Sequence, residues 1–95
     1  MKITLSEDAA KWYEQELALK KGDYVRFFVR YGGNSTIQTG FSLGMQIDEP
    51  ISVGTAITFN GINYYIEETD LWYFDSKELH IQMDQALNEP VFSYT

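Results

Sequence analysis

The chain has 95 residues, 44% of them hydrophobic, no cysteine and a formal net charge of -7. A chain of this length and composition forms one small domain, here residues 1–95, with enough apolar side chains to bury a core. The missing thiols exclude disulfides and Cys-ligated zinc or iron–sulfur sites, and the negative charge argues against binding nucleic acid.

The N-terminal stretch predicts a short strand followed by an amphipathic helix. Lys2–Leu5 alternates as a strand does, and Ser6 is a good N-cap for a helix over residues 6–20. We expect Gly22 to be the C′ residue of this helix, because glycine adopts the left-handed conformation there at low cost. The helix carries an apolar stripe made of Ala9, Trp12, Tyr13 and Leu17.

Two alternating runs predict strands over Tyr24–Tyr31 and Phe41–Asp48, the second ended by Glu49-Pro50. One face of the first strand is apolar or aromatic and consists of Val25, Phe27, Val29 and Tyr31. The second strand is expected to be half-buried, with Phe41, Leu43, Met45 and Ile47 alternating with more polar or small residues. The other face of the first strand mixes rings and cations and consists of Tyr24, Arg26, Phe28 and Arg30. Either this mixed face is partly covered, with the arginine stems over the rings, or it lines a groove.

The clearest local signal is a β-hairpin over Thr55–Glu67. Asn60-Gly61 separates two alternating runs, and a type I′ turn needs positive φ at both of its central residues. The residues that we expect to face inward around it are Ile57, Phe59, Ile62, Tyr64 and Ile66.

The C-terminal third predicts short elements. Thr69-Asp70 is expected to cap a helical turn over Leu71–Phe74, and Glu78–Asp84 alternates as a strand. A turn at Asn88-Glu89-Pro90 then leads to a last short strand, Val91–Tyr94. One helix followed by many short strands predicts an α+β fold that is mostly β, with the helix packed on mixed or antiparallel strands.

The stretch between the second and third predicted strands is the candidate site. Gly32 and Gly33 let the backbone turn or approach a ligand closely, and the polar residues Asn34, Ser35 and Thr36 follow them. We expect a pocket beside this stretch, with Arg26 and Arg30 as candidate contacts for an anion.

The order of these elements resembles the HesB/IscA-like family, the A-type iron–sulfur carrier domain, over nearly the whole chain. The resemblance rests on Ile3–Ala10 as the strand-then-helix start and on Val25–Gly33 as the second strand running into Gly-Gly. Its most specific part is Asp70–Asp75, followed by Leu79, the Leu87–Glu89 turn and Phe92. The resemblance implies the same fold for this chain.

The cluster ligands of that family are missing here. The family binds its cluster or iron with three cysteines, one after the Gly-Gly and two in a C-terminal Cys-Gly-Cys. Here Asn34 stands at the first position, and the sequence ends at Thr95, before that tail. His80 is the only histidine, and it shares one face of its strand with Glu78, Gln82 and Asp84. Strand alternation places such residues in a row in any case, so they are weak evidence for a metal site. We therefore expect no cofactor and no metal site.

The sequence favours a non-catalytic role. We expect a cysteine-free HesB/IscA-like binding or adaptor protein, connected through a protein partner to iron–sulfur cluster assembly or iron metabolism. The alternative is a small-ligand or metal-ion binding module that uses the pocket beside Gly32–Thr36. No motif positions a nucleophile or a base, so an enzyme is not expected.

The surroundings of the protein follow from charge and hydropathy. Residues 1–47 contain six Lys/Arg and five Asp/Glu, whereas residues 48–95 contain one and nine, so the second half could dock a basic partner. No apolar run approaches the ~18 residues of a membrane span, and the first residues lack a signal-peptide pattern, which predicts a cytoplasmic protein. Open strand edges predict a monomer or a homodimer.

Overall fold

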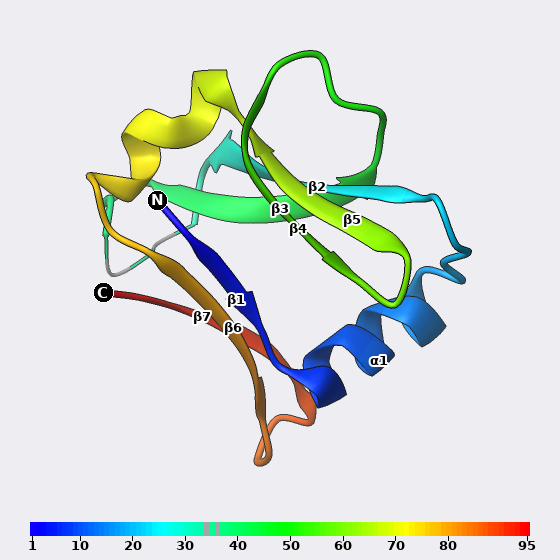
Figure 1. Ribbon diagram of the computed structural model, residues 1–95. Coiled ribbons are helices and arrows are strands. Elements are labelled where there is room, and N and C mark those ends of the chain that lie inside the picture. Colours follow the sequence, from blue (N-terminus) through cyan, green and yellow to red (C-terminus); the bar gives the residue numbers. More distant parts are fainter. Residues whose placement is uncertain (34, 36) are drawn as a thin grey trace.

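The computed structural model describes residues 1–33, 35 and 37–95, which form seven strands, one α-helix and one 3-10 helix (Figure 1). In chain order the elements are β1 (Ile3–Leu5), α1 (Glu7–Glu16), β2 (Tyr24–Tyr31), β3 (Phe41–Ile47), β4 (Val53–Phe59), β5 (Ile62–Glu67), the 3-10 helix η1 (Glu68–Phe74), β6 (Leu79–Asp84) and β7 (Glu89–Tyr94). The fold is therefore α+β and mostly β, as predicted.

The strands form two sheets that share one core. The smaller sheet has the order β1-β6-β7 and the larger one β3-β2-β5-β4, with β1 parallel to β6 and β2 parallel to β5. Both sheets and the helix contribute to a single buried cluster, in which Ile81 of β6 lies with Phe27 of β2. Tyr13 of α1 packs edge-on against Phe27, with ring centroids 6.0 Å apart, so the helix is attached by its aromatic stripe.

The helix begins as predicted but ends one turn early. Ser6 is the N-cap, and its Oγ accepts a hydrogen bond from the Ala9 N–H. At the other end Ala18 takes positive φ (51°), and the Leu19 N–H reaches back to the Glu14 carbonyl (3.0 Å), which is the bonding pattern of a Schellman motif. The predicted end at residue 20 with Gly22 as C′ is therefore wrong. Gly22 instead serves a separate turn, where its N–H bonds to the Gly61 carbonyl (2.8 Å).

The strand predictions hold, with corrections at exposed ends. The Asn60-Gly61 turn has positive φ at both residues (53° and 77°), which confirms the type I′ hairpin. Tyr31 and Ile47 belong to the apolar faces of their strands, yet both side chains are exposed, because the strands that carry them extend past the core. Pro90 was placed in a turn but lies in β7, opposite Met83, and β7 can accept it because it is an outer strand.

The predicted cap of η1 is also wrong. The N-cap residue is Glu67, and no side chain caps the helix. Asp70 does not cap because its carboxylate faces β2, where it accepts hydrogen bonds from Arg26 Nη2 (3.1 Å) and from the Val29 N–H (3.4 Å).

The outer face of the larger sheet is covered more fully than strand alternation suggests. Tyr65 and Glu67 alternate with the core residues of β5 and yet are buried, because the segment 48–52 crosses over them between β3 and β4 (Figure 1). On the same face the Phe28 ring lies over Gly44, so a Cβ at position 44 would come within 2.7 Å of the ring.

Candidate functional site

The predicted site lies on the connection between β2 and β3. Its ends are held by the Gly32 N–H, which donates to the Gly40 carbonyl (2.8 Å), and by Ser42 Oγ, which donates to the Gly32 carbonyl (3.0 Å). Inside the connection Ser35 Oγ accepts from the Gln38 N–H and donates to the Gln38 carbonyl, both at 3.1 Å. Gly32 and Gly33 have positive φ (115° and 69°), which is why glycine suits this turn. Asn34 and Thr36 lie outside the described residues.

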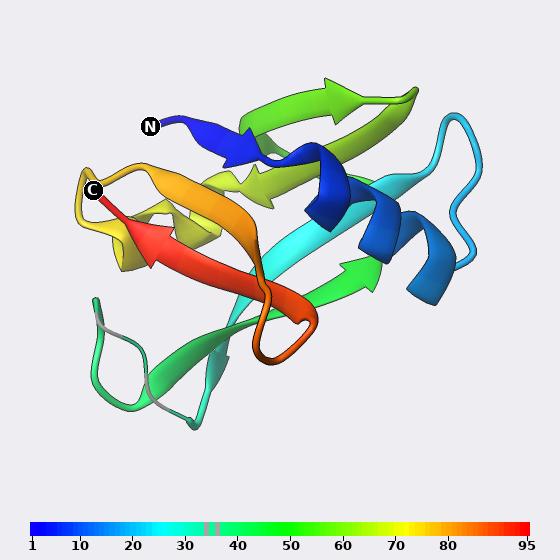
Figure 2. The ribbon, with the colours of Figure 1, turned by 90° about the horizontal axis from the view of Figure 1, so that it is seen from below.

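A pocket of about 340 Å³ lies beside this connection. Ser35 and Ser42 reach it from the β2–β3 side, and β7 supplies the opposite wall. The residues that line the pocket are Ser35, Ser42, Leu43, Pro90, Val91, Phe92 and Tyr94. Figure 2 shows the two strands involved, β3 and β7, which are outer strands of different sheets.

The two predicted arginines do not line this pocket. Arg26 pairs with Asp70, and its guanidinium carbon lies 6.0 Å from the centre of the Phe28 ring. Arg30 donates through Nε to Ser42 Oγ (3.0 Å), so it contacts a residue of the pocket without lining the pocket itself. The mixed face of β2 is thus partly covered, with an arginine over a ring, which is one of the two arrangements that the sequence allowed.

An exposed aromatic cluster next to the connection was missed from the sequence. Phe41 stands between Tyr31 and Trp72 in edge-on contacts, with ring centroids 5.7 Å and 5.3 Å apart. Tyr31 is 89% exposed and Trp72 is 53% exposed. We name these three residues the aromatic cluster. Its only signal in the sequence is that aromatic residues end β2, begin β3 and occur in η1.

A buried carboxylate fixes the segment that covers the outer face. Glu67 is 5% exposed and accepts hydrogen bonds from the Ile51 N–H (2.7 Å) and the Ser52 N–H (2.8 Å). These two bonds hold the pKa of the Glu67 carboxyl below its ordinary value. Through these two bonds the carboxylate fixes the position of the segment 48–52 over the sheet.

Metal ligation finds no support in the part of the chain that is described. His80 bridges two hydroxyls, with Nδ1 2.6 Å from Thr4 Oγ1 and Nε2 2.6 Å from Thr95 Oγ1. No three side chains of His, Asp or Glu in this part come together as a metal site would require. An iron–sulfur cluster needs thiolates, which the sequence lacks, so the donor set does not fit that cargo. None of the described helices has the length and apolarity of a membrane span.

Known proteins resemble this chain along nearly its whole length. The profile of a family described as iron-sulphur cluster biosynthesis matches residues 1–93. A Bacillus subtilis (strain 168) protein named "Pyruvate dehydrogenase inhibitor" is 51% identical over 94 residues, which are 99% of this chain and 99% of that protein. An uncharacterized protein of Staphylococcus saprophyticus is 39% identical over 92 residues, 94% of each chain.

One solved structure has a similar backbone. It is the crystal structure of Escherichia coli SufA, described as involved in biosynthesis of iron–sulfur clusters, with a TM-score of 0.59. The similarity covers 99% of this chain and 79% of that chain at 19% sequence identity. It confirms the predicted fold.

Proposed function

Because the chain belongs to the iron–sulphur cluster biosynthesis family and yet has no cysteine, we propose that it is a non-catalytic regulator that binds and inhibits pyruvate dehydrogenase. The observation that carries this proposal is the 51% identity, over 99% of both chains, to the Bacillus subtilis protein named for that inhibition. We further propose that it acts in the cytoplasm, as a protein-binding domain that neither carries a cluster nor binds nucleic acid.

The aromatic cluster is the surface that we assign to the partner. Exposed aromatic side chains are enriched in protein interfaces, where they bury a large area at low entropic cost. Tyr31 and Trp72 are both more than half exposed, and Phe41 supports them from below. Such a surface supports inhibition by contact, without a reaction at this chain.

The test is an inhibition assay with Bacillus subtilis pyruvate dehydrogenase complex. Purified chain is titrated into the complex, and pyruvate-dependent NADH formation is followed. We expect saturable inhibition, and we expect Tyr31→Ser to raise the concentration for half-inhibition by at least about tenfold, as loss of an interface hot spot does. Leu87→Ser is the matched control, because Leu87 is 62% exposed and belongs to the turn before β7.

Two results would contradict the proposal. If wild-type chain at saturation leaves NADH formation unchanged, the inhibitory role fails. If the chain, reconstituted anaerobically with ferrous iron and sulfide, holds a stoichiometric iron–sulfur chromophore, the non-carrier role fails. Circular dichroism of each variant establishes that it is folded before it is compared.

A second candidate function is small-ligand binding in the 340 Å³ pocket. The observation in its favour is that the pocket lies beside the predicted stretch and is lined by Ser35 and Ser42. A thermal-shift screen of small anions and metal ions tests it. Shifts that Arg30→Ala removes would support it, since Arg30 holds Ser42. Shifts that both Arg26→Ala and Arg30→Ala leave unchanged would count against the predicted anion contacts.

A further inference from the structure

The strand β7 is the outer strand of its sheet, and no strand in the described part of the chain pairs with its second edge. The backbone groups on that edge can be assigned. Glu78 and Thr95 exchange both backbone hydrogen bonds (2.9 Å and 3.2 Å), so this pair is a hydrogen-bonded pair of the antiparallel ladder. Such pairs alternate with non-bonded pairs. Ser93 and Val91 therefore bond to β6, and the N–H and C=O groups of Tyr94 and Phe92 point away from it.

The place of Pro90 agrees with this alternation. Pro90 lies opposite Met83, two residues before Phe92, at a position whose backbone points away from β6. The missing N–H of proline therefore costs no bond to β6. Proline often protects an outer strand against pairing, but here it blocks one donor only and leaves those of Phe92 and Tyr94 open.

The open edge faces the pocket. Four of the pocket residues belong to β7, and across from them lie Ser42 and Leu43 of β3. Phe92 and Leu43 give the pocket an apolar wall, whereas Ser35, Ser42 and Tyr94 add polar atoms to its lining, with their hydroxyls bonded to Gln38, Gly32 and Tyr73. A strand edge with free donors and acceptors, next to an apolar groove, is the arrangement that binds an extended peptide by strand addition.

We propose that β7 binds an extended segment of the pyruvate dehydrogenase complex, which adds as a fourth strand to the sheet β1-β6-β7. The choice of partner rests on the proposed function. The segment pairs with the Pro90 carbonyl and with the backbone groups of Phe92 and Tyr94, and it places alternate apolar side chains in the pocket between β7 and β3. A span of about five residues is sufficient, because two residues of a strand separate successive outward groups.

Peptides provide the first test. Overlapping peptides of about twelve residues that tile the subunits of the Bacillus subtilis complex are screened against the labelled chain. The best binder is then resynthesised with single backbone N-methyl groups. We expect N-methylation at alternate residues to weaken binding by at least about tenfold and at the intervening residues to leave it unchanged. The proposal is overturned if none of the tiled peptides binds. It is also overturned if N-methylation weakens binding at every residue instead of at alternate residues.

Amide hydrogen exchange locates the pairing. In the free chain we expect the Phe92 and Tyr94 amides to exchange at least about tenfold faster than those of Val91 and Ser93. Saturating peptide should slow Phe92 and Tyr94 to the level of their neighbours. If the same two amides become protected without peptide as chain concentration rises, a second copy of this chain is the occupant and the proposal is wrong.

A variant separates this inference from the proposed function. Val91 is 37% exposed and lines the pocket, so Val91→Glu adds a charge there, and Val91→Thr is the control of similar shape. We expect Val91→Glu to weaken both the peptide and the inhibition at least about tenfold, with Val91→Thr close to wild type. Inhibition that survives Val91→Glu overturns the groove alone, whereas failure of wild-type chain to inhibit overturns the proposed function.

Discussion

Two neighbouring tyrosines show how differently one residue type can be used. Tyr64 and Tyr65 are both buried in β5, on opposite faces of the sheet. The Tyr65 hydroxyl donates to the Asp48 carbonyl (2.6 Å), whereas the Tyr64 hydroxyl has no hydrogen-bond partner among the described residues. Burial without a partner costs free energy, and burial with one does not.

The two tyrosines should therefore respond in opposite directions to loss of the hydroxyl. We expect Tyr64→Phe to raise the free energy of unfolding by about 1 kcal/mol and Tyr65→Phe to lower it by about 1 kcal/mol. Urea unfolding of the two variants, measured beside wild type, gives both values. A loss of stability in Tyr64→Phe would show that its hydroxyl is satisfied in solution, which is the opposite of what the structure indicates.

The sequence predicted the burial of Tyr64 but not the burial of Tyr65, and the reason is physical. Alternation in the 55–67 hairpin places Tyr64 inward correctly. It cannot reveal that residues 48–52 cover the other face, because that cover depends on the Glu67 bonds to a distant backbone. The predicted site was limited in the same way. Its glycine turn and serine could be inferred, but β7, far away in sequence, supplies most of the pocket wall.

At the level of elements, local signals succeeded where a residue's own conformational preference decides the structure. Asn60-Gly61 fixes its turn, and Ser6 fixes the start of α1. The end of α1 was missed because Ala18 holds a conformation that alanine disfavours by about 1 kcal/mol. Packing of the segment after the helix must offset that cost, and packing cannot be seen in a local pattern.

The helix end makes a direct prediction. Ala18→Gly should raise the free energy of unfolding by about 1 kcal/mol and the unfolding temperature by about 4–8 °C, because glycine adopts positive φ without the steric cost. Calorimetry measures the shift. Ala86→Gly is the control, since Ala86 is also exposed in a turn but is not among the residues with positive φ. Equal effects at both positions would contradict the assignment of the Schellman motif.

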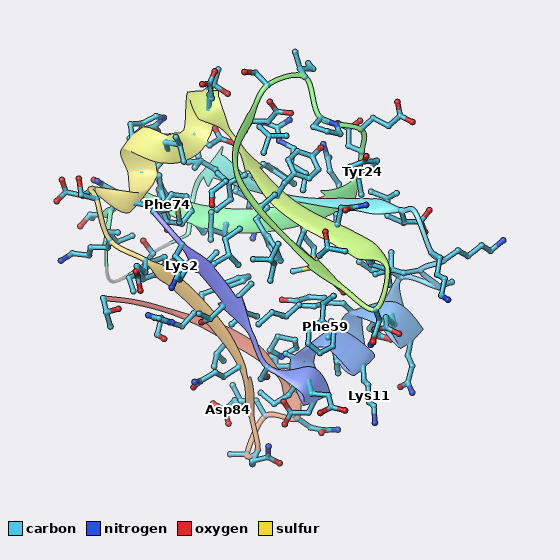
Figure 3. The ribbon with its side chains drawn as sticks, in the orientation of Figure 1. Lys2, Lys11, Tyr24, Phe59, Phe74 and Asp84 are labelled. Carbon is cyan, nitrogen blue, oxygen red and sulfur yellow. The ribbon has the colours of Figure 1, made fainter. Side chains whose placement is uncertain are left out.

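At the scale of the molecule, the seven strands, the helix and the 3-10 helix of the described residues share a single core that contains many rings. Figure 3 shows side chains from both sheets filling the space between the two sheets. Phe59 lies on the side of this space near α1, and Phe74 lies on the side near η1. The order of the elements along the chain was sufficient to infer the family. The arrangement of two sheets around one core required the structure, because it depends on contacts between strands that are far apart in sequence.

Burial of so many ionisable groups gives stability a defined pH range. Burial raises the pKa of Tyr64 to about 12 and also raises the pKa of Tyr13 and Tyr94, whereas backbone hydrogen bonds lower the pKa of Glu67. A raised pKa in the folded state gives stability that is present below pH 10 and lost as the pH rises further. A lowered carboxyl pKa gives stability that is present above pH 4.5 and lost as the pH falls.

The unfolding temperature should therefore fall on both sides of a plateau, below about pH 4.5 and above about pH 10. Differential scanning fluorimetry across this range measures both limbs. Glu67→Gln should lower the plateau and flatten the acid limb, whereas Glu49→Gln, a change in an exposed residue within the segment 48–52, should leave both unchanged. An alkaline limb that Tyr64→Phe does not reduce would contradict the role of the buried phenols.

The ring of Phe28 over Gly44 has a consequence for how this chain can vary among its relatives. A methyl group at position 44 would require that ring to swing away, because it would lie 2.7 Å from the ring edge. Residues 28 and 44 are cross-strand partners, so the two positions share one volume. They should covary: an aromatic residue at one goes with glycine at the other, and a larger residue at 44 goes with a small one at 28.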